Sequence, residues 1–192
     1  MNILEAYIKK YKQIIILILG LPCTNKSEIA KELGSDLGFE VIKINNFLIG
    51  EKFKEVNIDG VNTKLYEDTE NYDWDKLNST INEFKSRGVI LYGNYLDCDK
   101  IESDIDFTFF YSMNITTCKK ILVEKKMIEF DVEESEQVLN KYFDKVFIPL
   151  YEDIKNKIKV NKFFNIKEET KFNESYDEIF DILMEFISKK IK

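Results

Sequence analysis

The chain has 192 residues, of which 44% are hydrophobic, and it carries a formal net charge of −7. This length suits one domain of ordinary size, and we expect residues 1–192 to form a single domain with its own core. An acidic chain is a poor candidate for general nucleic-acid binding, which needs a basic surface. The absence of histidine excludes mechanisms that need an imidazole base or a histidine metal ligand.

The three cysteines, Cys23, Cys98 and Cys118, lie far apart in the sequence and form no C-x-x-C pair. We interpret them as reduced thiols rather than as a disulfide framework or a zinc site. The apolar run Ile14–Leu19 is too short to cross a bilayer, which needs about 20 residues, and no signal-peptide pattern is visible. We therefore expect a cytoplasmic protein without a membrane partner.

The first part of the chain alternates between helix and strand patterns. An amphipathic pattern predicts a helix over Ile3–Tyr11, and the run Ile14–Leu19 predicts a strand buried on both faces, as in the middle of a parallel sheet. A second helix is expected over Lys26–Leu37, because hydrophobic side chains recur there at helical spacing. Gly38 is predicted to end this helix, and Glu40–Ile44 to form the next strand.

The segment from residue 45 to residue 73 lacks a regular pattern. It contains many charges and the pair Asp59-Gly60, and we interpret it as loop with short helical pieces that forms a functional insertion. Asp73 is a candidate N-cap for the helix that follows. The remaining predicted elements are helix 74–86, strand 89–92, strand 106–111, a helix from Asn114 or Thr116 to about 128, helix 134–157 with a bend at Pro149, strand 159–166 and helix 174–191.

The order of these elements indicates a fold class. Strands that alternate with helices favour crossover connections and a mostly parallel sheet. We therefore predict a three-layer α/β fold in which helices flank a five-stranded, mostly parallel sheet. The final helix carries an apolar stripe that suits either the core or a dimer face, so both a monomer and a homo-oligomer stay open.

The strongest chemical signal is the segment Gly20–Ser27, which follows the first predicted strand and precedes the second helix. It fits the phosphate-binding pattern G-x-x-x-x-G-K-[ST] at seven of eight positions. Such a loop points successive backbone N–H groups inward, and the helix N-terminus adds positive potential. We predict that Lys26 reaches the β- and γ-phosphates of a nucleotide and that the Ser27 hydroxyl binds Mg²⁺. The backbone amides expected at the phosphates are those of Gly20, Cys23, Thr24 and Asn25.

One position of this motif departs from the pattern, because Asn25 stands where the motif has glycine. Asparagine is the residue other than glycine that best tolerates a positive φ, so the loop conformation stays accessible. The alternative interpretation is an ordinary turn between a strand and a helix, with a lysine in the first helical turn.

Several segments, taken in order, resemble the uridine kinase-like branch of P-loop kinases, which includes nucleoside kinases and phosphoribulokinase. The match spans about residues 14–166, and the order of the segments carries it more than any one of them does. The matching segments are Gly20–Ala30, Ile44–Leu48, Tyr66–Leu77, Val89–Gly93, Asp106–Tyr111 and Glu136–Glu152.

The resemblance implies ATP with Mg²⁺ as cofactor and transfer of a phosphoryl group to a hydroxyl of a nucleoside or a related small molecule. It also implies a basic lid over the phosphates at about residues 119–131, where Lys119 and Lys120 would bind the nucleotide. Residues 45–73 would form an acceptor-site insertion. The residues expected near the acceptor are Phe47, Glu67 and Asp68.

The sequence departs from that family at four functional positions. The aspartate that acts as base in the family aligns with Asn45, which can orient a hydroxyl but cannot take its proton. A glutamate near Mg²⁺ aligns with Tyr92, and a substrate-site histidine aligns near Asp68. The lid arginines are mostly lysine or apolar here, and lysine lacks the bidentate fork of arginine. The lid lysines are Lys119, Lys120, Lys125 and Lys126.

Two functional hypotheses follow from this mixture of matches and departures. In the first, the protein is an ATP-dependent, nucleoside kinase-like enzyme with Lys26 and Asn45 as catalytic residues. In the second, it is a catalytically degenerate kinase fold that binds a nucleotide or a protein. The lid lysines are also explained by a solvated helix face, and the acids near the acceptor by solvated loops.

Overall fold

The computed structural model of the protein describes residues 2–49, 53–65, 68–124, 140–167 and 172–192. Five strands form one sheet in the order β2-β5-β1-β6-β7, and every neighbouring pair is parallel. The predicted five-stranded parallel sheet is therefore confirmed. Its strands are β1 (Ile15–Gly20), β2 (Glu40–Lys43), β5 (Val89–Gly93), β6 (Phe107–Met113) and β7 (Lys162–Ile166).

Strand β1 lies in the middle of the sheet, between β5 and β6, and each of its six residues is buried. This burial explains why its sequence is a continuous apolar run without alternation. Because all five strands are parallel, their C-terminal ends meet at one edge of the sheet, which we call the carboxyl edge. The opposite edge, where the strands begin, is the amino edge.

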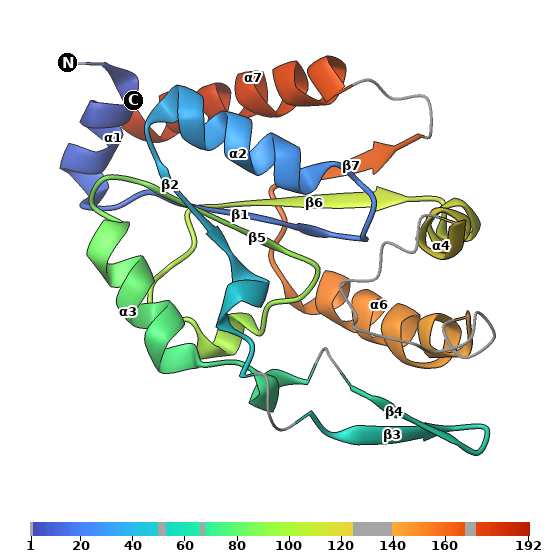
Figure 1. Cartoon of the computed structure of the whole chain (residues 1–192). Coiled ribbons are helices and arrows are strands. Elements are labelled where there is room, and N and C mark those ends of the chain that lie inside the picture. The colour runs from blue at the N-terminus through green and yellow to red at the C-terminus, as the bar shows by residue number, and fades with distance from the viewer. Residues whose placement is uncertain (1, 50–52, 66–67, 125–139, 168–171) are drawn as a thin grey trace.

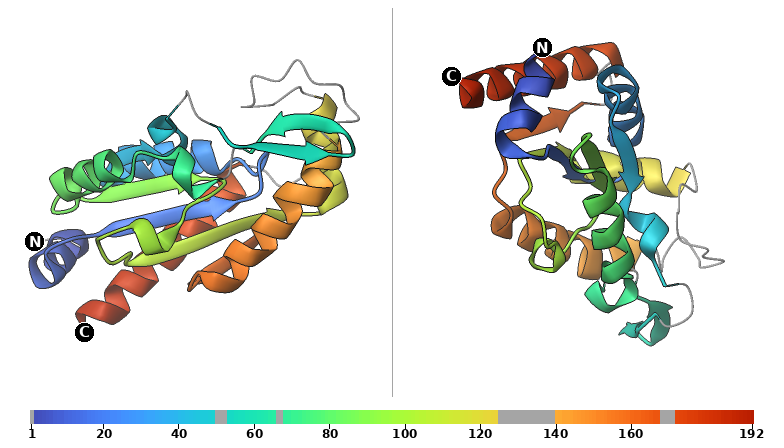
Figure 2. Two further views of the ribbon diagram at one scale, coloured as in Figure 1. Left: turned by 90° about the horizontal axis from the view of Figure 1, so that it is seen from below. Right: turned by 90° about the vertical axis from the view of Figure 1, so that its left-hand side faces the viewer.

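Helices cover both faces of the sheet, so the predicted three layers are confirmed. Figures 1 and 2 show α1, α2 and α7 on one face and α3 and α6 on the other, with α4 beyond the carboxyl edge. The helices are α1 (Ile3–Tyr11), α2 (Lys26–Leu37), α3 (Trp74–Phe84), α4 (Ile115–Glu124), α6 (Ile148–Lys157) and α7 (Phe172–Ile191).

Local capping signals set several helix ends. The carboxylate of Asp73 accepts a hydrogen bond from the backbone N–H of Lys76 at 3.0 Å, so this residue caps α3 as predicted. At the start of α4, Asn114 rather than Thr116 is the cap, since its Oδ1 accepts from the N–H of Thr117 at 3.1 Å. Gly38 has a φ of 68° and ends α2.

The insertion over residues 45–73 contains a β-hairpin that the sequence analysis missed. Strands β3 (Glu55–Ile58) and β4 (Val61–Lys64) pair in antiparallel register. The residues between them, Asp59 and Gly60, have φ values of 51° and 88°, as a two-residue turn of the primed type requires. The expectation of loop with short helical pieces was wrong for this stretch, although η1 (Ile44–Phe47) and η2 (Thr69–Asn71) agree with it.

The helix expected over 134–157 is described from residue 140 onward, and it changes geometry before its proline. A π-helical turn, η4 (Phe143–Phe147), leads directly into α6, and the N–H of Ile148 donates to the carbonyl of Phe143. Pro149 has no N–H and its ring would crowd the carbonyl four residues earlier, so a wider turn fits in front of it. Within the described ranges, no helix is long and apolar enough to cross a membrane.

Candidate functional site

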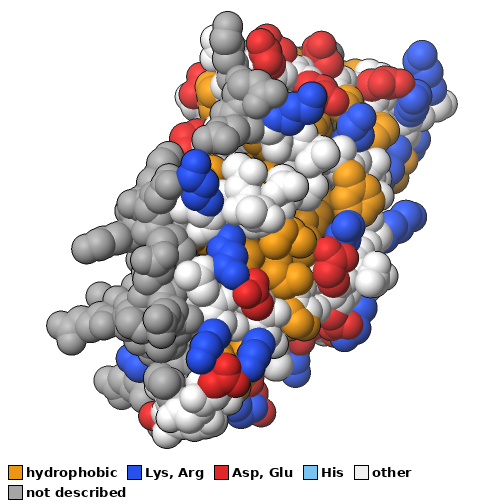
Figure 3. All heavy atoms as spheres, turned by 90° about the vertical axis from the view of Figure 1, so that its right-hand side faces the viewer, with side chains coloured by type: hydrophobic (Ala, Val, Ile, Leu, Met, Phe, Trp, Pro, Cys, Tyr) orange, Lys and Arg blue, Asp and Glu red, His pale blue; other side chains and the backbone are white. Residues whose placement is uncertain are grey.

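The carboxyl edge gathers the loops that follow β1, β2, β5, β6 and β7. Figure 3 looks toward this side of the molecule and shows acidic and basic side chains interspersed around a strip of hydrophobic ones. In parallel α/β sheets, ligands bind at this edge, outside the ends of the strands. The predicted phosphate-binding loop lies here, because it joins the end of β1 to the start of α2.

The backbone of this loop has the conformation of an anion-binding nest. Cys23 and Asn25 have φ values of 64° and 57°, whereas Thr24 between them does not have a positive φ. An alternation between right-handed and left-handed residues turns successive backbone N–H groups toward one concave side. Asn25 is therefore left-handed where the motif has glycine, as the sequence analysis expected of an asparagine at this position. Cys23 is a second left-handed residue, and no sequence signal pointed to it.

Gly20 fixes the start of the loop against the neighbouring strand. Its φ is 144°, and a Cβ atom at this position would lie 1.8 Å from the carbonyl oxygen of Tyr111 on β6. That same carbonyl accepts a hydrogen bond from the N–H of Leu21 at 2.9 Å. Only glycine fits here, because any side chain would displace the backbone contact that holds the loop to the sheet.

The side chain of Lys26 turns back across the loop. Its Nζ donates to the carbonyl oxygen of Leu21 at 2.8 Å, and the Oγ1 of Thr24 donates to the same oxygen at 2.7 Å. Lys26 is only 7% exposed and Thr24 only 1%. A buried ammonium group bonded to the loop places a positive charge against the nest of N–H groups, where an anion would be stabilised.

Helix α4 packs against the loop through a buried thiol. The Sγ of Cys118 donates to the carbonyl oxygen of Pro22 at 3.5 Å. Burial raises the pKa of Cys118 to about 12, so it stays a neutral thiol at neutral pH. No disulfide joins Cys23, Cys98 or Cys118, in agreement with the predicted reduced thiols.

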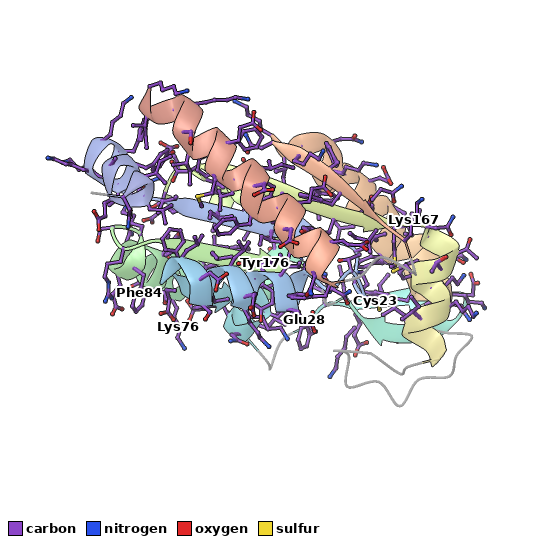
Figure 4. All side chains as sticks on the ribbon, turned by 90° about the horizontal axis from the view of Figure 1, so that it is seen from above. Cys23, Glu28, Lys76, Phe84, Lys167 and Tyr176 are labelled. Carbon is purple, nitrogen blue, oxygen red and sulfur yellow. The ribbon has the colours of Figure 1, made fainter. Side chains whose placement is uncertain are left out.

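A cavity of about 690 Å³ lies at the ends of β6 and β7 and the first turn of α4, the helix whose Cys118 contacts the loop at Pro22. Amide and hydroxyl side chains line it beside aliphatic ones. Figure 4 shows Cys23 of the loop and Lys167, which follows β7, at the same end of the sheet beside α4. The lining residues are Met113, Asn114, Ile115, Thr116, Thr117, Asn165, Ile166 and Lys167.

None of these cavity residues was predicted from the sequence to bind a ligand. The pattern that could have found them is positional, because Asn114 directly follows β6 and Asn165 lies near the end of β7. Side chains at the ends of neighbouring parallel strands converge at the carboxyl edge.

The two described lysines of the predicted lid differ in their surroundings. The Nζ of Lys119 lies 2.6 Å from Oδ2 of Asp144, so its charge is matched by a neighbouring helix. Lys120 is exposed on α4. The rest of the predicted lid, including Lys125 and Lys126, lies outside the described residues.

The predicted acceptor residues are only partly brought together. Asn45 and Phe47 lie in η1, directly after β2, and Phe47 is buried in the hydrophobic core. Asp68 caps η2 by accepting from the N–H of Glu70 at 2.9 Å, and it also pairs with Lys54 at 3.1 Å. Its carboxylate thus has local partners. Glu67 lies outside the described residues.

Two further residues stand at the end of β5, where the resemblance predicts a carboxylate. Tyr92 is buried at 7% exposure and is paired in register with Lys43 of β2 and Ile18 of β1. Tyr95 is also buried, and burial together with the charge of Asp97 raises its pKa to about 12. A phenol group does not replace the carboxylate oxygens that hard cations prefer as ligands.

Among the described residues, no three or more cysteine, aspartate and glutamate side chains are grouped so that they could hold a metal ion. The hydroxyl of Ser27, in the first turn of α2, is the predicted metal ligand, and it is half-buried beside the loop. A hard cation that keeps most of its water and binds nucleotide phosphates needs few protein ligands. The residues present therefore fit Mg²⁺ only as the companion of a bound phosphate.

No protein-family model matches the chain, and no curated protein sequence matches it. Solved structures do resemble it. The chain is similar to a gluconokinase from Sinorhizobium meliloti 1021, with 10% identity, a TM-score of 0.54, and coverage of 93% of this chain and 94% of that one. It is also similar to thymidylate kinase from Candida albicans, with 14% identity, a TM-score of 0.55 and coverage of 94% of both chains.

These likenesses, together with the parallel sheet and its flanking helices, show the fold of the P-loop kinases. The two neighbours carry different activities in their names, so the shared fold does not select a substrate. The narrower resemblance to the uridine kinase-like branch stays a prediction.

Proposed function

We propose that the protein binds a nucleoside triphosphate at Gly20–Ser27 and transfers its terminal phosphoryl group to a hydroxyl of a nucleoside or a related small molecule. The observation that carries the proposal is the ammonium group of Lys26, held 2.8 Å from the carbonyl of Leu21 in a loop whose φ changes sign at successive residues. Phosphoryl transfer depends mainly on positioning and on neutralising charge, and this loop supplies both.

Each residue of the loop would have one task. The backbone N–H groups around Thr24 would hold the β-phosphate, and Lys26 would offset the charge on the transferring group. Asn45, at the end of β2, would orient the attacking hydroxyl, whose proton would leave to water because an amide cannot accept it. When bound, Mg²⁺ neutralises charge on the phosphates, and Ser27 would be its ligand from the chain.

The base of the nucleotide would occupy the cavity beside the loop. The amides of Asn114 and Asn165 and the hydroxyls of Thr116 and Thr117 can donate to and accept from the polar edge of a purine. This lining does not by itself favour adenine over guanine. ATP is our prediction, and GTP is its natural competitor in the assay.

A second candidate function is nucleotide binding without turnover, in a sensor or a protein-binding module. The observation that favours it is Tyr92, buried at the end of β5 where a catalytic kinase of the resembled branch has a carboxylate. Asn45 in place of a base points the same way. Loss of a general base alone costs roughly 10²- to 10⁴-fold in rate.

Thermal-shift measurements with ATP·Mg²⁺ and with GTP·Mg²⁺ test the binding proposal. We expect a rise in melting temperature that depends on nucleotide concentration. Lys26→Ala should weaken binding by about 10- to 100-fold, because hydrogen bonds to charged groups contribute about 1.5–3 kcal/mol. Lys31→Ala, an exposed lysine on the same helix, is the matched control and should bind normally. The absence of any shift in the wild-type protein would sink both candidate functions.

Turnover separates the two candidates. Phosphoryl transfer is measured across nucleosides, nucleoside monophosphates and sugars, with each triphosphate in turn. If the missing base limits the rate, Asn45→Asp should raise turnover by at least about 10-fold, and Asn46→Asp, an exposed neighbour, should not. Nucleotide binding with no turnover in either protein would leave the binding module as the function.

A further inference from the structure

The β3–β4 hairpin is fastened at its base within the insertion itself. Lys54 precedes β3, and its Nζ lies 3.1 Å from Oδ2 of Asp68 and 2.9 Å from Oε2 of Glu70, both of which follow β4. The backbone N–H of Leu65 also donates to the carbonyl of Lys54 at 2.7 Å. These contacts join the two ends of the hairpin to each other, and none of them involves the turn at its tip.

The tip of the hairpin is held by a distant part of the chain. Oδ2 of Asp59 lies 3.1 Å from Nζ of Lys141, and its Oδ1 lies 2.5 Å from Nζ of Lys145. We call Asp59, Lys141 and Lys145 the tip cluster. The hydrogen bonds from Lys145 and Lys141 lower the pKa of Asp59, so its carboxylate stays charged at neutral pH.

The turn itself does not require the charge of Asp59. It is closed by Asn57, whose Oδ1 accepts from the N–H of Gly60 at 3.0 Å and whose Nδ2 donates to Oδ1 of Asn62 at 2.7 Å. Asparagine or glycine would suit the left-handed backbone of Asp59 as well as aspartate does. The carboxylate therefore matters for the contact with the lysines and not for the shape of the turn.

The two lysines, in turn, need an acid between them. Lys141 and Lys145 are four residues apart on one continuous helix, where like charges repel. Lys157 and Lys189 instead have an acid four residues away on their own helices, Asp153 and Glu185. The tip cluster thus relieves a local repulsion by a contact between two separate elements.

The same helix also contacts α4, which packs against the phosphate-binding loop. Asp144, which lies between the two lysines in sequence, pairs with Lys119 of α4 at 2.6 Å. The next residue toward the N-terminus of α4 is Cys118, whose thiol donates to the carbonyl of Pro22 in the loop. Figure 1 shows the hairpin, the start of the α6 helix and α4 on the same side of the molecule.

We infer that the tip cluster is a coupling device that makes the hairpin and the helix over 140–147 move as one body. Through Asp144 and Lys119, this body is linked to α4 and so to the loop Gly20–Ser27. Coupling between distant sites needs a contiguous set of contacts with two arrangements, and the cluster is the contact that can open. The inference concerns motion and does not depend on the proposed phosphoryl transfer.

Hydrogen–deuterium exchange of the full-length protein tests this inference. Asp59→Asn keeps the turn but removes the charge, and amides in 55–64 should exchange roughly two- to fivefold faster, the range that exposed ion pairs contribute to an opening equilibrium. Amides in 140–147 should accelerate as well. Asp153→Asn, which breaks an exposed pair within α6, is the matched control and should leave the hairpin unchanged.

Two further arms complete the test. Raising the NaCl concentration to about 1 M should accelerate exchange more in the wild-type protein than in Asp59→Asn, in which only the ion pairs of Lys54 at the hairpin base remain to be screened. Lys141→Gln combined with Lys145→Gln removes the same contact from the other side, leaves the turn unchanged, and should accelerate the hairpin amides to the same extent as Asp59→Asn. Unchanged exchange in the hairpin, or acceleration that stops at the hairpin and spares 140–147, would overturn the inference.

Discussion

The two edges of the sheet are built by different means. At the amino edge, Asp106 accepts from the hydroxyl of Tyr7 at 2.7 Å and from the N–H of Ile15 at 2.8 Å. Lys190 of the last helix covers the ring of Phe107, with its Nζ 4.8 Å from the centroid. At the carboxyl edge the loop after β1 places left-handed residues where a ligand would bind, and the ion pairs of Lys119 and Lys145 with other elements are more exposed.

This difference suggests that the amino edge contributes mainly to stability and the carboxyl edge mainly to ligand binding. Hydrogen bonds to a partly buried charge fix one arrangement, since an unpartnered donor there costs free energy. Exposed ion pairs contribute little each, so they can change arrangement when a ligand arrives. We therefore expect changes at the amino edge to lower stability without altering nucleotide binding, and changes at the carboxyl edge to do mainly the reverse.

The largest expected effect comes from Gly20→Ala, which would break this simple division. The new Cβ would meet the carbonyl of Tyr111, a backbone atom that cannot move aside, so we expect a loss of about 4 kcal/mol in unfolding free energy. Urea unfolding measures the loss, and nucleotide binding should disappear with it. Gly38→Ala is the control, because its φ is also positive but no atom lies within 4 Å of the added Cβ. If both variants lost the same unfolding free energy, contact of the new Cβ with the Tyr111 carbonyl would not be the cause.

Asp106→Ala should have the next largest effect and would sharpen the comparison. It removes the acceptor of Tyr7 and of Ile15, so we expect the unfolding free energy to fall by about 3 kcal/mol. Nucleotide-induced thermal shifts should keep their size. The exposed neighbour Asp104, replaced by alanine, should change stability by less than about 0.5 kcal/mol. Weaker nucleotide binding in Asp106→Ala would show that the two edges are not separable.

The smallest expected effect tests whether the loop stores backbone strain. Cys23 has a φ of 64°, a conformation that costs a side chain about 1 kcal/mol and glycine almost nothing. Cys23→Gly should therefore be about 1 kcal/mol more stable than Cys23→Ala, since both variants lack the thiol. Chemical unfolding of the pair provides the comparison. If alanine is equally stable, the loop carries no strain at this residue.

Much of the fold could be predicted because buried strands leave a strong signal. The apolar runs of β1 and β5 and the helical spacing of α2 reflect burial that the structure reproduces. The hairpin was missed because Glu55–Ile58 is short and mostly polar, although Asp59-Gly60 is a recognised turn signal. The π-turn before Pro149 has no established signature in sequence. Its form depends on how the helix packs.

The position of the candidate site could be predicted from its motif, but the contacts of its side chains could not. Spacing located Gly20–Ser27, and the tolerance of asparagine for a positive φ anticipated the backbone at Asn25. The hydrogen bond from Lys26 to Leu21 and the left-handed Cys23 arise from the closure of the loop on β6. Asp68 was predicted to face an acceptor, but its pairing with Lys54 depends on a hairpin that sequence reasoning did not foresee.

The π-turn over Phe143–Phe147 determines which side of this helix carries Lys141. A π-turn holds one residue more than an α-helical turn, and one residue corresponds to about 100° of rotation around a helix axis. Deleting a single residue there would return the helix to regular α geometry and rotate everything upstream relative to α6. Asp59 would then face a different side of that helix. Relatives with a regular helix at this point should therefore lack a basic pair at the positions of Lys141 and Lys145.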